Sequence, residues 1–541
     1  MARITRRHLL QSAPLAALAL AGCADRERGK SAGGAGESIL LRGNGPDPDS
    51  LDAHRARSWE SMVVLRDLFE CLTRLDRHAA AVPAAAESWT VSDDGRVYVF
   101  KLRPNLRWSN GDPLVAEDFV AGLRRLVDPA TASQYAQVVD VIVNASEIVQ
   151  GQKPIESLGV AAPDDLTVTV TLTNPAPYLP GLMAHPSTAP LHRASLAQHG
   201  DRFSRPGMQV SNGAFVLTEW LQGSYIIARR NRNHWNDAAN KLDAVKYLHI
   251  ADENAELRAY RAGELHCTAV VPRGQFGWIQ ENLAKELHVA PQLSTYYFGF
   301  NLDRPLFKDP RVRRALSMVI DRERLTQSVL RVGEVPAYSW VPPGVNDYTA
   351  QSFDYVGAPM PERIAAAREL LSAAGYSRAK PLDFELRYNT GEVHAKVAVA
   401  VASMWKEALG IEPRLAAVEF KSLMQDIDRR EVDVFRTSWI GDYNDPYTFL
   451  QYLKSSFGIN LPRYASTRYD ALLDEASAQT QPSRRRELLE EAERTALADH
   501  PLIPLYFYVN KHLVKPSLVG WYDNVMNVVY SQDLAVSGPP G

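Results

Sequence analysis

The chain has 541 residues, of which 45% are hydrophobic, 23% charged and 9% aromatic. This length favours two or three domains, and the formal net charge of −3 gives no sign of nucleic-acid binding. With three cysteines, Cys23, Cys71 and Cys267, the sequence offers neither a disulfide scaffold nor a paired-cysteine metal knuckle. No internal stretch reaches the roughly 18 uninterrupted apolar residues that a membrane span needs.

The first segment predicts export from the cytoplasm. A basic start that includes Arg6 and Arg7 precedes an apolar stretch from Leu9 to Ala21, and Gly22-Cys23 follows. This pattern resembles the bacterial lipobox, which implies cleavage before Cys23 and attachment of lipid to its thiol. The alternative is an ordinary signal that Cys23 happens to follow. Residues 1–23 are therefore predicted to be a signal peptide.

Arg6 and Arg7 also resemble a twin-arginine signal, so the Sec and twin-arginine routes both stay open. Either route predicts a protein in the periplasm or on the outer face of the cytoplasmic membrane. The lipid on Cys23 would hold the protein at a membrane. Residues 24–38 are polar and glycine-rich, which is typical of a flexible tether.

The first half of the mature chain mixes strand and helix patterns. Residues 39–42 predict a first strand, and the spacing of apolar residues in 61–75 predicts a helix. Further strands are expected at 97–102, 166–172, 226–230 and 245–250, and further helices at 116–127 and 255–262.

The second half continues the mixture. Helices are expected at 311–331, 361–374, 397–409 and 482–498, with a short strand at 433–435. No fixed-period repeat is visible. The pattern predicts an α/β fold, with a suggestion of two lobes around a cleft.

Several segments, in the same order along the chain, match the motifs of one family. The most specific are Ser50–His54, Trp108–Phe119, Tyr296–Asn301 and Trp439–Pro446; Asn212–Phe215, Asn231–Trp235 and Phe307–Leu316 add to them. Together they resemble the bacterial extracytoplasmic solute-binding proteins of family 5, and within that family the oligopeptide-binding members. The likeness covers nearly the whole mature chain.

The resemblance implies a fold of the periplasmic binding protein type II-like class, with three interleaved domains forming two lobes around a ligand cleft. Domain I would contain 39–69, 195–293 and 510–541, domain II would be 70–194, and domain III would be 294–509. A hinge would close the lobes over the ligand.

The implied function is capture of short peptides and their delivery to the membrane permease and ATPase subunits of an ABC transporter. A monomer without cofactor, metal or catalytic step is expected. A broad-specificity peptide binder must take its affinity from the backbone, the ammonium and the carboxylate, which all peptides share.

By resemblance, Asp442 is the residue that receives the peptide ammonium, although an aspartate in such a sequence more often caps a turn. The resemblance also places nine other residues in the cleft. Arg436 could pair with the ligand carboxylate or with a protein acid, and His394 matches a position implicated in carboxylate recognition. The other expected cleft residues are Trp439, Ser438, Tyr135, Tyr508, Phe420, Arg57 and Trp59.

Departures from the family pattern bear on specificity. Arg57 stands where close relatives carry an acidic cleft residue, and Phe420 stands where they carry a tryptophan. Ser294 and Ile440 replace a cysteine pair, so that disulfide cannot form. A bridge between Cys71 and Cys267 stays open, although Cys71 is expected to be a small core residue.

Other readings remain as alternatives. Neither HExxH nor GxSxG is present, which speaks against an enzyme. A relative of narrow specificity could bind cell-wall peptides, a metal chelate or haem. A peptide-binding receptor or chaperone without transport is the remaining alternative.

Overall fold

The computed structural model describes residues 37–377 and 379–538. The predicted signal peptide, the lipid-acceptor Cys23 and nearly all of the predicted tether lie outside the described residues. The compact unit that begins at Ser38 contains all the elements discussed below. None of the helices in its described residues is long and apolar enough to cross a membrane.

The first lobe is built on two four-stranded sheets that pack around one hydrophobic core. One sheet has the order β1 (Ile39–Gly43), β10 (Ala244–Leu248), β9 (Tyr225–Arg230) and β8 (Phe215–Leu221). The other has the order β4 (Ala86–Val91), β5 (Val97–Leu102), β7 (Thr167–Thr171) and β6 (Val160–Asp164). The helices are α1 (Trp59–Leu68), α2 (Ala116–Val127), α3 (Ala145–Val149), α4 (Leu179–Leu182) and α5 (Arg193–His199). Two small hairpins, β2 (Thr73–Leu75) with β3 (Ala81–Pro83) and β17 (Leu518–Val519) with β18 (Ala535–Val536), complete it.

The second lobe is built on one six-stranded mixed sheet around a second core. The strand order is β12 (Val335–Pro336), β16 (Leu502–Leu513), β11 (Leu287–Phe300), β15 (Val434–Ile440), β13 (Glu385–Asn389) and β14 (Arg414–Val418). Its helices include α8 (Pro305–Lys308), α9 (Pro310–Met318), α10 (Arg322–Arg324), α11 (Met360–Ala373) and α12 (Glu392–Leu409). The others are α13 (Phe420–Asp428), α14 (Tyr447–Leu450), α15 (Thr467–Ala478) and α16 (Pro482–Asp499), with a π-helix, η7, at Leu325–Leu330.

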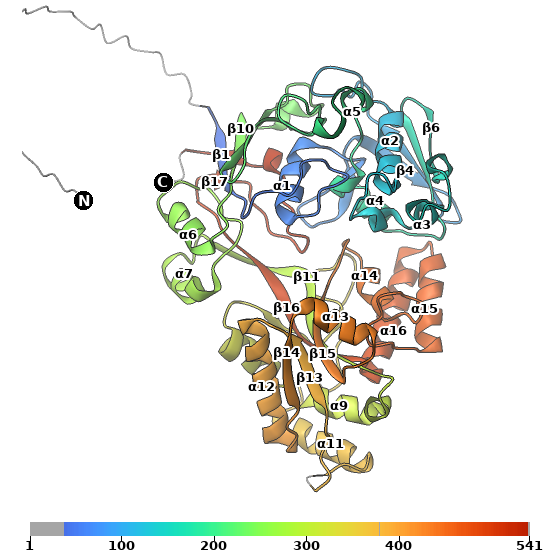
Figure 1. Ribbon diagram of the computed structural model, residues 1–541, viewed down its shortest axis with the longest axis vertical. Coiled ribbons are helices and arrows are strands. Elements are labelled where there is room, and N and C mark those ends of the chain that lie inside the picture. Colours follow the sequence, from blue (N-terminus) through green and yellow to red (C-terminus); the bar gives the residue numbers. More distant parts are fainter. Residues whose placement is uncertain (1–36, 378, 539–541) are drawn as a thin grey trace, which may run out of the picture. The chain divides into compact units, whose positions relative to one another are not determined.

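Two long antiparallel strands, β11 and β16, run side by side from the second sheet toward a small third core (Figure 1). That core packs α6 (Glu253–Arg261) and α7 (Phe276–Asn282) against Leu513, the last residue of β16. The predicted borders of domain III, 293/294 and 509/510, fall inside these two continuous strands. The assignment of residues to three domains stays a prediction.

Most of the predicted elements are present, and three need correction. The helix expected over 61–75 ends at Leu68, and 73–75 is strand β2, because Phe69 takes an extended conformation. The helix expected over 311–331 is broken: α9 ends at Met318, α10 begins only at Arg322, and η7 follows. The strand expected at 433–435 is longer and reaches Ile440.

Cys71 and Cys267 do not form a disulfide in the structure. Both cysteines are buried and free. Burial raises the pKa of each thiol to about 12, which keeps them protonated at neutral pH. They are core residues, as expected for Cys71.

Candidate functional site

The edge of the second sheet where β13 and β15 end places the central residues of the site. The two strands are parallel, so their carboxyl ends meet at the same edge. Asn389 is the last residue of β13, and α12 begins three residues later. Arg436 and Ser438 lie on β15, with Asp442 just beyond its end. The backbone therefore brings together residues that the sequence places about 50 apart.

Arg436 is a buried cation held only by neutral groups. Its guanidinium donates to Asn389 Oδ1 at 2.8 Å and to the hydroxyl of Tyr508 at 3.1 Å, and it lies 4.4 Å from the ring centroid of Tyr296. Only 6% of the residue is exposed, and its Nε has no hydrogen-bond partner. Among the described residues no carboxylate pairs with it. A buried charge normally has a counter-charge, so this site is prepared for an anion.

Tyrosines and His394 surround that guanidinium. The Tyr296 ring stacks on Tyr506 at 4.5 Å and on His394 at 5.8 Å, and the Tyr296 hydroxyl lies 3.3 Å from His394 Nδ1. Desolvation, with the charge of Arg436, lowers the pKa of His394 to about 4. The imidazole is therefore neutral at pH 7. It can donate a hydrogen bond to a ligand carboxylate but brings no charge of its own.

Asp442 has the opposite character. Its backbone N–H donates to Thr448 Oγ1 at 3.2 Å, and its carboxylate has no ion-pair or hydrogen-bond partner among the described residues. The residue is exposed to water. Partial desolvation and the negative charge of Asp140 raise the pKa of Asp442 to about 6.

The segment that carries Asp442 is fixed to the first lobe. The ring of Tyr443 stacks on Tyr178 with centroids 4.2 Å apart, and Tyr443 is buried in the core of the first lobe. The side-chain amide of Asn444 donates to the carbonyl of Ala79 at 3.1 Å. Asp442 thus stands where the two lobes meet, with Asp140 contributed by the first lobe.

The remaining predicted residues fall into two groups. Desolvation and the nearby negative charge of Asp442 raise the pKa of Tyr135. The Tyr135 hydroxyl donates to the carbonyl of Arg57 at 3.4 Å. Arg57 forms an ion pair with Asp49 at 3.5 Å and is largely exposed. Asp49 thus offsets the charge of Arg57. The net charge of the site therefore changes less than expected from an arginine in place of the acidic residue of close relatives.

Trp59 and Phe420 are half-exposed, and Trp59 covers the guanidinium of Arg66 at 5.1 Å. Trp439 behaves differently because alternation along β15 turns it to the face opposite Arg436. Its indole N–H donates to the carbonyl of Thr448 at 2.8 Å, and its ring packs on Tyr452. The Trp439 side chain is therefore partly buried against the core of the second lobe, and its place in the ligand site stays a prediction.

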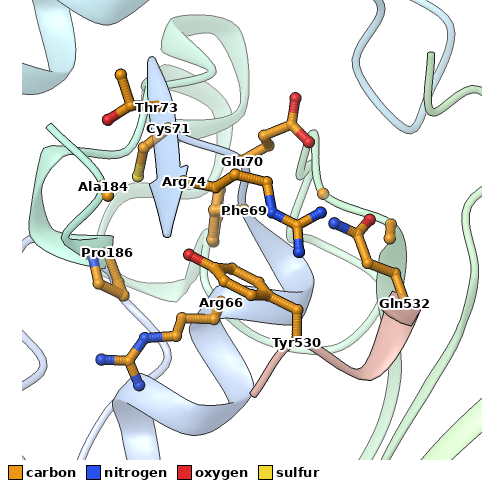
Figure 2. Close-up of a pocket in the computed structure, with 12 residues that line it drawn as sticks. Arg66, Phe69, Glu70, Cys71, Thr73, Arg74, Ala184, Pro186, Tyr530 and Gln532 are labelled. Carbon is orange, nitrogen blue, oxygen red and sulfur yellow. The ribbon is translucent and has the colours of Figure 1, made fainter. Parts of the chain in front are cut away.

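A small cavity between α1, β2 and the C-terminal segment is not a ligand site (Figure 2). Its volume of about 10 Å³ is near that of a single water. Arg74 lies over the ring of Tyr530 at 4.3 Å and pairs with Asp533. This region joins the C-terminal segment to the first lobe.

Sequence reasoning missed Asp140, Arg273 and Glu334. Arg273 donates to Glu334 Oε1 at 2.6 Å, and its charge acts on His394. No motif marks these residues, because they come from separate segments that meet only in the folded chain.

Comparison with known proteins shows the family of the chain. The family model described as "Bacterial extracellular solute-binding proteins, family 5 Middle" matches residues 80–460. The chain belongs to this family. The periplasmic oligopeptide-binding protein OppA of Escherichia coli is 37% identical over 96% of each chain. The probable deoxycholate-binding periplasmic protein YgiS of Escherichia coli is 39% identical, over 92% of this chain and 94% of its own.

Solved structures show the same fold. The murein tripeptide-binding protein MppA in its unliganded open form matches with a TM-score of 0.87 at 36% identity, over 93% of this chain and 98% of its own. Haemophilus influenzae OppA, solved with the peptide RPPGFSPFR, matches at 0.72 and 35% identity, over 93% and 99%. The substrate-binding domain of an oligopeptide ABC transporter from Bacillus anthracis matches at 0.68 and 28% identity, over 93% and 99%.

Proposed function

We propose that this protein is the extracytoplasmic substrate-binding component of an ABC transporter and captures short peptides between its lobes. The observation that carries the proposal is a pair of opposite charges that have no oppositely charged partner among the described residues. Within that part of the chain, Arg436 is buried without a carboxylate, and Asp442 has no cation. A peptide is a zwitterion with its charges at its two ends, and this arrangement complements it.

The separation of the two charges favours short peptides. Six residues of extended chain separate the two Cα atoms by about 20 Å, and the long Arg436 side chain can shorten the distance between the charges. Between them, Ser438 and the tyrosines Tyr135 and Tyr508 offer hydroxyl groups to a peptide backbone. An extended ligand of a few residues can thus reach both charges.

Binding would favour closure of the lobes. The ligand ammonium would meet Asp442 near Asp140 and Tyr135 of the first lobe, while its carboxylate would meet Arg436 of the second. A ligand that contacts both lobes stabilises the closed state relative to the open one. The continuous strands β11 and β16 are the natural hinge. The closed complex would then deliver its peptide to the permease.

The family itself shows that specificity needs a direct test, since the relatives include a probable deoxycholate-binding protein. Deoxycholate has a carboxylate but no ammonium, so it would leave Asp442 without a partner. The test is isothermal titration calorimetry of the purified mature chain, freed of bound ligand by unfolding and refolding. Tri-alanine is expected to bind, and N-acetylated tri-alanine and deoxycholate to bind much more weakly. Binding of deoxycholate alone would overturn the proposal.

Three finer expectations belong to the same proposal. Mature protein anchored through lipid on Cys23 would keep the captured peptide close to the permease. The chain would act as a monomer and without a catalytic step. Incubation with mixed peptides, followed by mass spectrometry, should show no new peptide termini.

A further inference from the structure

A pocket outside the proposed peptide site contains Arg273, whose charge acts on His394. It has a volume of about 570 Å³, within the usual range for ligand pockets. One wall is formed by residues 273–280 at the start of α7, and the other by 326–334 at η7 and the loop before β12. Gly274, Gly277 and Gly333 line the pocket without side chains, and Gln280, Thr326 and Gln327 supply polar groups.

Two arginines line this pocket, Arg273 and Arg331, and Arg273 is the one that pairs with the buried carboxylate of Glu334. Arg273 Nη2 donates to Glu334 Oε1 at 2.6 Å, while 38% of the Arg273 side chain stays exposed. Lys511 approaches the same carboxylate at 3.8 Å. Two cations therefore share one carboxylate, and the group keeps a net positive charge.

Glu334 is a rigid support for Arg273. Its side chain is completely buried, and its Oε2 has no hydrogen-bond partner among the described residues. It directly precedes Val335, which pairs with Phe507 of β16. Because the carboxylate cannot turn toward water, the guanidinium of Arg273 is held in one place, as a preorganised anion site requires.

The pocket is coupled to the site around Arg436. The charge of Arg273 reaches His394, and the charges of Arg436 and Glu334 both reach Tyr506. Tyr506, whose buried hydroxyl has no partner among the described residues, stacks on Tyr296 beneath Arg436. Pro336, two residues beyond Glu334, pairs with Tyr506, so Tyr506 and Tyr296 connect the wall of the pocket to Arg436.

We propose that Arg273, positioned by Glu334, is a second carboxylate-binding residue that receives the C-terminus of peptides too long to end at Arg436. This inference rests on the proposed function. A peptide that passes Arg436 and His394 enters the pocket between 273–280 and 326–334, and its terminal carboxylate pairs with Arg273. Arg273 belongs to the segment around the third core, and Arg436 to the second lobe. The two cations thus define two length classes of ligand.

The experiment is calorimetric titration with alanine peptides of three to six residues, each as the free acid and as the C-terminal amide. In the unmodified protein, one of the longer peptides should lose affinity on amidation. For that peptide, Arg273→Gln should weaken binding of the free acid by about tenfold or more, the usual effect of a charge-assisted hydrogen bond. Its amide should change less than about threefold. Tri-alanine should be insensitive to Arg273→Gln and sensitive to Arg436→Gln.

Glu334→Gln tests the positioning role of Glu334. It should reproduce the loss for the long free acid and spare both the long amide and tri-alanine. Arg258→Gln is the matched control, because Arg258 is an exposed arginine of α6 in a weak ion pair with Asp252 at 3.8 Å. It should change none of these affinities. Thermal melting of each variant checks that it is folded.

Two results would overturn the inference. If Arg273→Gln weakens free acids and amides equally at every length, the pair with Glu334 is only a structural contact. If no peptide of any length shows a loss specific to its free carboxylate, Arg273 does not bind the terminus. Failure of the proposed function looks different, because then not even tri-alanine binds the unmodified protein.

Discussion

The two ends of the proposed peptide site hold charge in opposite ways. Arg436 is buried, fixed by Asn389 and Tyr508, and unable to move without breaking both hydrogen bonds. Asp442 is open to water, its carboxylate has no hydrogen-bond or ion-pair partner among the described residues, and the charge of Asp140 acts on it. The proposed carboxylate end is therefore defined by geometry and the proposed ammonium end by electrostatics. The first should be selective for shape, and the second should respond to pH.

The largest effect is expected at the ammonium end. Asp442→Ala removes the carboxylate that is proposed to receive the ammonium, and should weaken binding of tri-alanine by roughly ten- to a hundredfold, as for other hydrogen bonds to charged groups. N-acetyl tri-alanine, titrated into both proteins, is the control and should bind equally weakly to each. Equal affinity of the variant and the unmodified protein for tri-alanine would remove Asp442 from the site.

A somewhat smaller loss is expected at the carboxylate end. Arg436→Gln keeps a donor but removes the charge, and should weaken tri-alanine by about tenfold. The amide of tri-alanine should lose much less, which calorimetry would show. Since the variant also relieves a buried unpaired charge, its melting temperature should not fall by more than a few degrees. A large fall would indicate that Arg436 is mainly structural.

The pH dependence sharpens the comparison. Asp442 must be ionised to bind an ammonium, and its pKa of about 6 lies above the ordinary value. Affinity for tri-alanine should therefore be full near pH 7 and decrease as the pH falls through 6, by up to tenfold per unit. Asp140→Asn removes the neighbouring negative charge, lowers the pKa of Asp442 and moves this decrease to lower pH. An unchanged profile in that variant would show that the two carboxylates do not interact.

The smallest effect is expected at Arg57. Its charge is offset by Asp49 and its side chain is exposed, so Arg57→Gln should change the affinity for tri-alanine by less than about threefold. The same titration with an alanine peptide that carries one central glutamate tests whether Arg57 attracts acidic side chains. A tenfold loss for that peptide alone would make Arg57 a specificity residue.

How far the sequence predicted the fold depends on the local pattern. Helix α2 matches its prediction at both ends, because an apolar stripe and two acidic residues in the first turn agree with each other. Strands β11 and β16 were not predicted, because most of their residues are buried on both faces and show no alternation. The break after Met318 was missed because its apolar spacing continues into η7.

The site likewise contains residues that the sequence predicts and residues that only the folded structure identifies. Resemblance pointed to Arg436, His394 and Tyr508, and the structure places these three side by side. That Arg436 lacks a carboxylate and that Trp439 faces the core depend on tertiary contacts and strand alternation, which motifs do not report. Asp140 and Arg273 carry no sequence signal, since each becomes meaningful only through a neighbour far along the chain.

The first lobe is held together by the two ends of the described chain. Arg42 of β1 donates to the carbonyl of Val529 and to Ser531, and Asp67 of α1 accepts from the backbone N–H of Ser531. These contacts join residues more than 460 positions apart. Contacts of such long range form late in folding. During synthesis, β1 and α1 therefore cannot complete their contacts until the last residues of the chain have been made.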